Sequence, residues 1–319
     1  METVDLETRE HVRRAFLDRG FVRVRFTTAD PVADHVSGWV ADGRHAGMEW
    51  MANAPERRAR PTDLLPGART VVCVAAAYAA TDARGPIAGY ARAEDYHRTL
   101  AAALEAGLEA AREWLPGVGA RVCVDTAPLL ERALAARAGL GWIGRNTLLL
   151  DETHGPWVLL GEVLLDVAVP PDAPVMDRCG TCTACIEACP TAALAPDPPP
   201  ASGRLDSRRC LSYWSIEHRG ELPDDWGRAL GHRVFGCDDC LTACPFPATP
   251  ALAPRGPLEP RADLVTPDLD ELEARAHESF KQHFGSTPLE RARKGGFLRN
   301  LAHVRRHAEG PTKGDPGPG

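Results

Sequence analysis

The spacing of apolar residues divides the first half of the chain into alternating helices and strands. Apolar positions at helical spacing predict an amphipathic helix over Asp5–Arg19, and a run rich in Ala, Leu, Glu and Arg predicts a longer helix over Ala93–Leu115. Two near-continuous apolar runs, Thr70–Tyr78 and Arg121–Asp125, have the composition of strands that are covered on both faces. Strands that alternate with helices in this way indicate an α/β domain.

A further helix signal follows the strand that ends at Asp125. Thr126 is a good N-cap residue, Pro128 falls in the first turn that this cap would begin, and the helix is predicted to continue over Leu129–Ala138. Trp157–Val169 is predicted to form one or two more strands. Asp125 is thereby placed between a buried strand and a helix N-terminus, where α/β sheets commonly carry functional groups.

The last third of the chain is predicted to be helical and basic. Helices are predicted over Asp268–Phe284 and Leu289–His307. From residue 275 to residue 307 the sequence has eight Lys or Arg against two Glu. The predicted organisation is an α/β domain at 1–170, a cysteine-rich domain at 171–250, a helical basic segment at 251–309 and a disordered tail at 310–319.

Composition and charge restrict the compartment and the partners. The 319 residues are 44% hydrophobic and 25% charged, which is ordinary for a globular protein. No apolar run approaches the roughly 20 residues that span a bilayer, and residues 1–26 lack an apolar signal core, so we expect a cytoplasmic protein without a membrane partner. The net charge of −7 gives no overall attraction to nucleic acid. Such a partner would bind the local basic segment, although a solvated pair of basic helices explains the same charges equally well.

The ten cysteines carry the strongest chemical signal. Disulfides are disfavoured in a cytoplasmic chain, so clustered cysteines indicate metal binding. Residues Cys179–Pro190 match the full C-x-x-C-x-x-C-x-x-x-C-P run of bacterial ferredoxins. Cys237–Pro245 is a partial copy that lacks one cysteine, which the isolated Cys210 can supply. Paired structural zinc sites are the alternative, but zinc needs neither the Cys-Pro ends nor shared fourth ligands.

The ferredoxin run also predicts which cysteines share a cluster. Three cysteines of a run hold one [4Fe–4S] cluster, and the fourth binds the other cluster. Applied to both copies, this rule divides eight cysteines into two sets with none left over. Cys73 and Cys123 lie in apolar strands and are predicted to be buried small hydrophobic residues. The predicted sets are Cys179, Cys182, Cys185 and Cys244, and Cys189, Cys210, Cys237 and Cys240.

The segment before the cysteines is predicted to use the electrons, since two clusters alone need only a short chain. Asp125 could donate a proton during a reduction if partial burial raises its pKa, although a capping or salt-bridged aspartate looks the same in sequence. Tyr96 and His97 open the long predicted helix and could donate protons, but caps and core aromatics look identical. The loop Gly141–Thr147 allows close approach to a large ligand without matching a dinucleotide or Walker fingerprint, which points to a cofactor other than nicotinamide.

Six segments add a family resemblance to this picture. They are Tyr90–His97, Val124–Glu131, Gly141–Thr147, Cys210–Glu217, Val234–Cys240 and Leu298–Asn300. Together they resemble the epoxyqueuosine reductase family, the cobalamin-dependent iron–sulfur enzymes of tRNA queuosine biosynthesis, over residues 5–303. The resemblance implies an α/β (α+β) cobalamin-binding domain, then a ferredoxin-like double [4Fe–4S] domain and a short helical C-terminal segment.

The resemblance also implies a mechanism and a set of site residues. Cobalamin would bind base-off between the two domains, and the clusters would pass electrons to its cobalt. Asp125 would be the proton donor that lets the epoxide oxygen leave as water, beside Tyr96 and His97. A flavodoxin- or ferredoxin-type donor would reduce a monomeric enzyme. The implied cobalamin contacts are Asp125, Asn146, Thr147, Leu149, Ser212, Cys237 and Asp238, and the implied tRNA contacts are Glu217, Arg219, Arg291, Arg293, Lys294 and Arg299.

Three departures from the family pattern accompany this likeness. The sequence ends within twenty residues of Leu298–Asn300, where family members often continue into helical repeats, so the way tRNA docks stays open. Arg145 stands where lysine is common and keeps the positive charge. Pro156 stands where a small hydroxyl residue is usual, so a side-chain contact to cofactor would be lost there while a backbone contact would survive.

Two other functions fit part of the same sequence. A corrinoid reductive dehalogenase also pairs cobalamin with two ferredoxin-type clusters, but it usually carries a twin-arginine export signal, which this sequence lacks. A plain electron-transfer module would bind only iron and sulfide and would give Asp125 no function. Corrin binding and the effect of an Asp125 substitution separate these readings.

Overall fold

The computed structural model describes residues 3–78, 85–201, 203–246 and 258–307. Its N-terminal part is built on a four-stranded sheet in the order β1-β2-β6-β3, and every pairing in it is antiparallel. A two-stranded ribbon, β4-β5, stands apart from this sheet. The strands are β1 (Arg23–Thr28), β2 (Thr70–Ala77), β3 (Ala120–Cys123), β4 (Trp142–Ile143), β5 (Leu149–Leu150) and β6 (Val158–Leu165).

The strand pairing differs from what the alternation of strands and helices indicates. That alternation is typical of parallel α/β sheets. Here β6 lies between β2 and β3, so the two strands joined by the α3 crossover are parallel but not adjacent. The domain is therefore mixed, with the α+β kind of sheet. The strand over Thr70–Tyr78 is confirmed as fully buried, whereas β1, which alternates polar and apolar residues, was not predicted.

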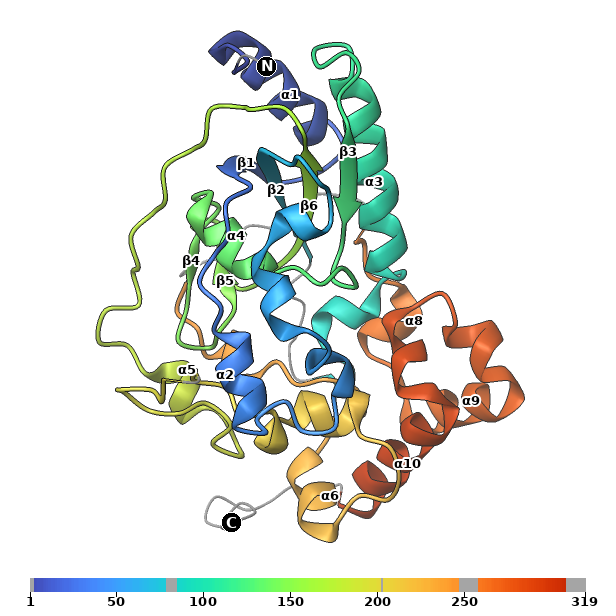
Figure 1. Cartoon of the computed structure of the whole chain (residues 1–319). Helices are drawn as coiled ribbons and strands as arrows, with labels where there is room; N and C mark the ends of the chain where they lie inside the picture. The colour runs from blue at the N-terminus through green and yellow to red at the C-terminus, as the bar shows by residue number, and fades with distance from the viewer. Residues whose placement is uncertain (1–2, 79–84, 202, 247–257, 308–319) are drawn as a thin grey trace.

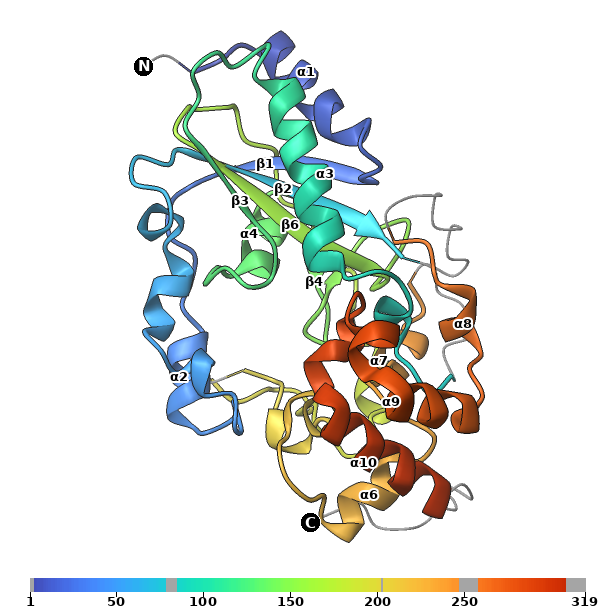
Figure 2. The same cartoon turned by 90° about the vertical axis from the view of Figure 1, so that its right-hand side faces the viewer.

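Helices cover both faces of the sheet. Helices α1 (Leu6–Leu17) and α3 (Tyr96–Ala111) pack side by side on one face, and α4 (Glu131–Arg137) covers the other (Figure 1, Figure 2). The contact between α1 and α3 is close at Gly107, where an added Cβ would lie 2.5 Å from the Phe16 ring. The helices and the sheet thus bury apolar side chains on both faces of the sheet. This burial is the main favourable contribution to folding.

Two helices begin at residues other than those that the sequence predicts. Helix α3 begins at Tyr96 rather than at residue 93, because Asp95 caps it by accepting a hydrogen bond from the His97 N–H. The predicted Thr126 cap is wrong: α4 begins only after Leu130, and the Thr126 hydroxyl donates to the Val124 carbonyl instead. The chain turns sharply before α4 because Asp125 has a φ of +49°.

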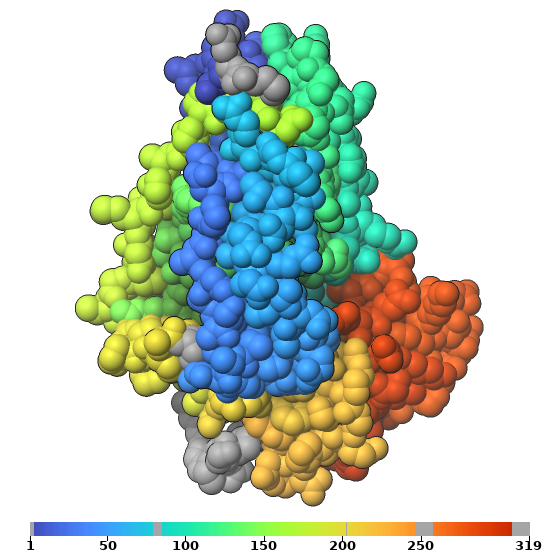
Figure 3. Space-filling view, viewed as in Figure 1, coloured from blue at the N-terminus to red at the C-terminus, as the bar shows by residue number. Residues whose placement is uncertain are grey.

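A segment of short helices runs down one side of the sheet. Figure 3 shows this segment covering the front of the molecule between the sheet and the cysteine-rich part. It holds Trp50, which is 41% exposed, and Arg58. The elements are α2 (Val36–Ala41), η1 (Glu49–Met51), η2 (Pro55–Ala59) and η3 (Pro61–Asp63).

A second apolar core lies among η4, the cysteine-rich part and the C-terminal helices, of which α9 and α10 are the longest. Asn300 links these helices to the cysteine-rich part, since its amide donates to the carbonyls of Ser215 and Val234 at 2.7 and 2.8 Å. The helix predicted over Leu289–His307 is split at Arg293, whose φ is +58°. The elements are η4 (Gly89–Arg92), α5 (Ala184–Glu187), η5 (Ser207–Arg209), η6 (Tyr213–Glu217), α6 (Asp224–Leu230), α7 (Asp239–Thr242), α8 (Ala262–Val265), α9 (Leu269–Phe284), η7 (Pro288–Ala292) and α10 (Arg293–Arg306).

Two predictions concern residues that the structure does not describe. The tail predicted at 310–319 and the domain boundary predicted near residue 250 both lie outside the described residues. Within the described part of the chain, no helix combines the length and the apolarity needed to cross a bilayer.

Candidate active site

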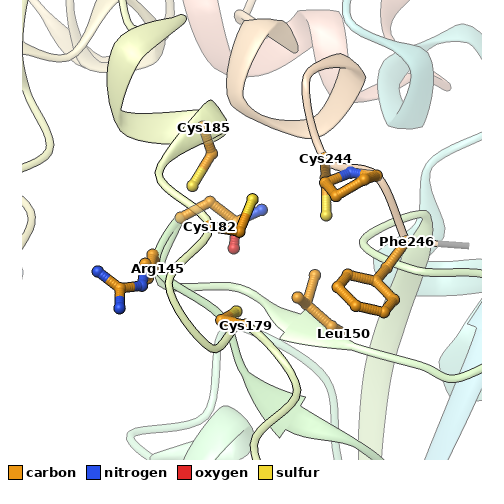
Figure 4. A pocket seen from close by; sticks show the side chains of 9 residues that line it. Arg145, Leu150, Cys179, Cys182, Cys185, Cys244 and Phe246 are labelled. Atoms are coloured by element: carbon orange, nitrogen blue, oxygen red, sulfur yellow. The ribbon is translucent and has the colours of Figure 1, made fainter.

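Four cysteine side chains from two distant segments line one pocket. Three come from the segment that leads into α5, and the fourth follows α7. Helices α5 and α7 lie against each other, which brings the two segments together. Figure 4 shows the four side chains around the same space. They are Cys179, Cys182, Cys185 and Cys244, the set that the crossing rule predicts for one cluster.

The walls of this pocket combine apolar and basic side chains. Leu150 and Phe246 lie on one side and Arg145 on the other (Figure 4). Arg145 donates a hydrogen bond to the Gly180 carbonyl at 2.6 Å and forms an ion pair with Asp197. An apolar wall and a fixed positive charge are features by which a protein tunes a bound iron–sulfur cluster.

The remaining four predicted ligands form a second group. Cys189 follows α5 but lies with the other three rather than with its own run. Burial, and then the neighbouring Cys237, Cys210 and Cys189, raise the pKa of the Cys240 thiol well above its usual value. The Ala193 N–H also points to the Cys189 sulfur at 3.2 Å. The structure therefore brings the eight cysteines together in the two predicted groups.

Asp125 forms a hydrogen-bonded chain with His97 and Asp95. The loop after β3 carries Asp125, and the first turn of α3 carries His97. The His97 Nε2 lies 2.9 Å from Asp125 Oδ2, and its Nδ1 lies 2.7 Å from Asp95 Oδ1. The imidazole is thus held between two carboxylates. Burial lowers the pKa of His97, but the bonds to these carboxylates outweigh it and leave the pKa raised.

The pKa of Asp125 is shifted in the direction opposite to our expectation. Burial acts to raise it, but the hydrogen bond and charge of His97, with smaller effects of Tyr96 and Arg291, leave the pKa lowered. The side chain of Asp125 is 56% exposed, so burial is too weak to keep it neutral. Asp125 is therefore the ionised group of the pair, and the His97 imidazole is the group that holds the proton.

Tyr96 keeps its proton beside this pair. Burial, and then the charge of Asp125, raise the pKa of its phenol far above the ordinary value. Its ring stacks on the His97 ring with centroids 4.1 Å apart. Tyr96 and His97, predicted from one segment, and Asp125, predicted from another, therefore form one cluster of titratable groups.

Contacts lead from Asp125 to the glycine-punctuated loop. The Asp125 N–H donates to Glu131 Oε1 at 2.6 Å. The next residue of α4, Arg132, donates to the Thr147 carbonyl. Thr147 has a φ of +66°, which marks a tight turn in the loop between β4 and β5. The α4 N-terminus thus connects the proton-bearing cluster with one predicted part of the cobalamin site.

The same loop reaches the second group of cysteines. Asn146 is 4% exposed, and its amide donates to the Cys240 carbonyl at 3.4 Å. Its Oδ1 accepts from the Leu148 N–H at 3.2 Å, which fixes the turn. Leu149 is buried in β5. The loop therefore lies between Asp125 and the thiols.

Ser212 and Asp238 lie next to members of the second group, which itself includes Cys237. Ser212 lies against the sulfur of Cys210. Asp238 is 6% exposed and accepts a hydrogen bond from the Gly89 N–H at 2.7 Å. Burial raises the pKa of Asp238 to about 6, although the Gly89 bond acts against this shift. Ser212, Asp238 and the loop at 146–149 flank the same cysteines.

Three of the predicted tRNA contacts form an interface between η6 and η7. Arg291 donates to the Glu217 carboxylate at 2.9 Å, and its guanidinium lies 4.7 Å from the centre of the Trp50 ring. Arg219 donates to the carbonyls of Arg291 and Ile216 at 2.8 and 3.0 Å. Glu217, Arg219 and Arg291 thus hold these segments together near Asp125, whose charge acts on Arg291.

The other predicted tRNA contacts lie on α10. Arg299 donates to the carbonyls of Trp214, His218 and Gly220, at 3.1, 3.2 and 2.6 Å, and is only partly exposed. Arg293 and Lys294 are exposed at the start of the helix, where Lys294 donates to a carbonyl of α9 at 3.2 Å. The geometry therefore separates a structural arginine, Arg299, from two side chains that face solvent.

Three residues of this region were not predicted as functional. Asp95 and Glu131 lie within segments that carry the family resemblance, but only the fold shows that they bind His97 and the Asp125 backbone. Glu162 lies in the middle of β6 and is 0% exposed. In the sequence Glu162 stands out as a single acid inside an apolar run. A carboxyl at such a position is expected to be buried and either neutral or paired.

Family models match two parts of the chain. Residues 178–247 match a 4Fe-4S double cluster binding domain. Residues 58–126, which include His97 and Asp125, match a domain described as epoxyqueuosine reductase QueG, DUF1730. One match thus contains the clustered cysteines, and the other contains the Asp125–His97 pair.

Relatives and solved structures agree with these models. An epoxyqueuosine reductase of Xanthomonas campestris is 38% identical over 304 residues, which is 91% of this chain and 84% of the relative. A crystal structure of epoxyqueuosine reductase with an epoxyqueuosine-modified tRNA stem loop is 28% identical, with a TM-score of 0.81 over 95% of this chain and 82% of that one. The Bacillus subtilis enzyme, with its catalytic loop swung out of the active site, is 26% identical, with a TM-score of 0.79 over the same shares. The chain with its double cluster binding domain therefore belongs to the epoxyqueuosine reductase family of oxidoreductases.

Proposed function

We propose that this chain reduces epoxyqueuosine in the wobble position of tRNA to queuosine, with two [4Fe–4S] clusters, base-off cobalamin and Asp125 as proton donor. The observation that carries this proposal is the placement of the Asp125–His97 pair. A series of contacts through α4 and the 146–149 loop connects this pair with the second group of cysteines. A reductase brings a proton source and an electron source to one substrate, and the contacts between this pair and the cysteines support such a role.

The residues between these two sources suit a bound cobalamin. They are polar groups and backbone from two sides, namely Asn146, Thr147, Ser212 and Asp238, around cysteines that would hold the second cluster. When bound, cobalamin would supply the reducing centre that accepts electrons from the clusters. These side chains would hold and orient it, and a flavodoxin- or ferredoxin-type protein would be the external donor.

The proton chemistry can be assigned to this chain's own side chains. Removal of an epoxide oxygen as water takes up two electrons and two protons. His97 carries a proton against the Asp125 carboxylate, and Asp125 is the more exposed of the two side chains, at 56% against 31%. We infer that Asp125 takes the proton from His97 and delivers it to the substrate oxygen, while Asp95 stabilises the imidazolium. The second proton would come from water through the same pair.

The pair should be visible in the titration of His97. We expect the pKa of the His97 imidazole, measured by NMR, to lie above 6.5 in the wild type and to fall in the Asp125→Asn and Asp95→Asn variants, because each removes a carboxylate partner. The raised pKa keeps the imidazole protonated to higher pH, so the single-turnover rate should fall as the pH rises through that value. Asp18→Asn, an exposed aspartate after α1, is the control and should leave the His97 pKa unchanged. An unshifted His97 in the Asp125→Asn variant would remove the pair from the mechanism.

The exposed basic residues of α10 are the proposed tRNA contacts. We expect Arg293→Gln and Lys294→Gln each to reduce the slope of log Kd against log salt by roughly one, because each removes a phosphate contact. Arg299→Gln should instead lower the free energy of unfolding, by about 1.5–3 kcal/mol, because its guanidinium binds three carbonyls of the fold.

The salt experiment has a matched control at the far end of the molecule. Arg14→Gln on α1 removes an exposed arginine distant from α10 (Figure 1) and should leave the slope unchanged. If Arg293→Gln and Lys294→Gln also leave it unchanged, the docking face lies elsewhere.

The function itself is tested by reconstitution without oxygen. The protein is supplied with cobalamin, and iron, cobalt and the conversion of epoxyqueuosine-bearing tRNA are measured. We expect about eight irons and one corrin per chain, with conversion to queuosine. Eight irons with no corrin and no conversion would leave an electron carrier as the better account.

A further inference from the structure

The backbone of Asp125 is held in an unfavourable conformation by one side chain. Its φ of +49° lies in the left-handed region, which residues other than glycine seldom adopt unless the surroundings impose it. The Asp125 N–H donates to Glu131 Oε1 at 2.6 Å, from the first turn of α4. This bond spans the loop from residue 125 to residue 131 and fixes the turn that aims the Asp125 carboxylate at His97.

A second buried carboxyl lies behind Glu131. Glu162, at the centre of the sheet, is paired across the strands with Cys73 and Cys123 and is 0% exposed. Among the described residues, neither of its carboxyl oxygens has a hydrogen-bond partner. Among charged groups, Glu131 acts most strongly on the Glu162 carboxyl, and Asp125 acts on it less. The three acids thus follow one another from the centre of the sheet to the candidate site.

These carboxyls cannot all be ionised. Burial, and then the charge of Glu131, raise the pKa of Glu162 well above its ordinary value, so Glu162 keeps its proton. Burial and the charge of Asp125 raise the pKa of Glu131 to about 7. The Glu131 carboxyl can accept from the Asp125 N–H whether Glu131 is protonated or ionised, because a carboxyl keeps an acceptor oxygen when protonated.

We propose that Glu131 is a positioning residue for Asp125: its carboxyl accepts from the Asp125 N–H and holds the loop at 124–130 in the closed conformation. This inference rests on the proposed role of Asp125. A related enzyme has been seen with its catalytic loop swung out of the active site, so a loop of this family can occupy a second position. In this chain such a movement would have to break the Glu131 bond to the backbone of Asp125 and the His97 bond to its carboxylate.

The titratable groups around the loop come from five other elements besides α4. Basic groups approach it from η2 and η7, α3 contributes an imidazole and a phenol, η4 a second phenol and β6 a carboxyl. The titratable and charged groups that act on Asp125 or respond to it are Arg58, Tyr90, Tyr96, His97, Glu131, Arg132, Glu162 and Arg291.

The test compares Glu131→Ala with Glu131→Gln in the full-length protein with its clusters assembled. Alanine removes the acceptor, whereas glutamine keeps an amide carbonyl at the same distance. In Glu131→Ala we expect hydrogen exchange of the amides at 125–127 to rise, the NMR pKa of His97 to fall as Asp125 leaves it, and the single-turnover rate to drop by about 10- to 100-fold. Glu131→Gln should restore most of the exchange protection and of the His97 pKa.

Two controls separate the proposal from a general loss of structure. Glu105→Gln, an exposed glutamate on α3, should match the wild type in all three measurements. If Glu131→Ala does not fold, Glu131→Asp serves instead, because its carboxyl is one methylene too short to reach the Asp125 N–H. Wild-type exchange and a wild-type His97 pKa in the folded variant would overturn the proposal.

The outcome is distinguishable from a failure of the proposed function. Exchange and the His97 pKa are read without substrate, so they report on the loop even if Asp125 turns out not to donate the proton. A freed loop in Glu131→Ala together with a fully active Asp125→Asn variant would uphold the positioning role and reject Asp125 as the donor.

Discussion

Replacing Asp125 by asparagine is expected to lower the single-turnover rate of epoxide reduction by about 10²–10⁴-fold, the usual contribution of a positioned acid. An amide can neither take up the proton that His97 holds nor pass it to the substrate oxygen. The variant should keep its iron content and its affinity for tRNA, because the cysteines and α10 do not depend on the Asp125 side chain. The measurement is one turnover of epoxyqueuosine-bearing tRNA with the clusters reduced beforehand.

The matched control for this variant is Asp18→Asn, which removes an exposed carboxylate that pairs with Arg14 of α1. It should turn over at the wild-type rate. An Asp125→Asn enzyme that also works at that rate would remove the proton-donor assignment and would leave His97 or Tyr96 as the acid.

The crossing of the cysteine runs predicts an unusual pattern in double variants. Under the crossing rule Cys185 and Cys244 serve one cluster, so Cys185→Ala with Cys244→Ala should destroy that cluster and leave the other with four thiolates and about four irons. Cys237→Ala with Cys244→Ala removes one ligand from each site and should leave no cluster with a full set of thiolates. Iron analysis after chelator treatment, together with Mössbauer spectra, distinguishes the two proteins.

Cys73→Ala with Cys123→Ala is the control, because both thiols are buried in the sheet away from the two groups, and burial raises the pKa of each. It should retain about eight irons. If each run instead supplied its own cluster, the results of the two test proteins would be exchanged: the Cys237 and Cys244 pair would keep an intact cluster, and the Cys185 and Cys244 pair would not. Activity should be lost in both test proteins, because the proposed reaction draws its electrons through both clusters.

Much of the candidate site could be predicted because its signals are local. A ferredoxin run places its sulfur atoms by a fixed spacing, and its crossing ligands follow from the same rule, so the two groups of cysteines could be written down before the fold was known. Asp268 likewise caps α9 through its own side chain, which is a short-range interaction. The continuous apolar run of β2 could be read as a buried strand for the same reason, since burial on both faces demands apolar residues at every position.

The sequence by itself thus determined the family, the grouping of the eight cysteines and most of the longer helices, but not strand β1. Only the tertiary structure decided how the sheet pairs, which way the pKa of Asp125 shifts, and which basic residues of the C-terminal part are structural. These depend on groups far apart in the chain: β6 enters between β2 and β3, His97 meets Asp125 across 28 positions, and Arg299 binds carbonyls some 80 positions away. Electrostatic and hydrogen-bond energies depend on distance in space, and that distance is set by packing rather than by local sequence.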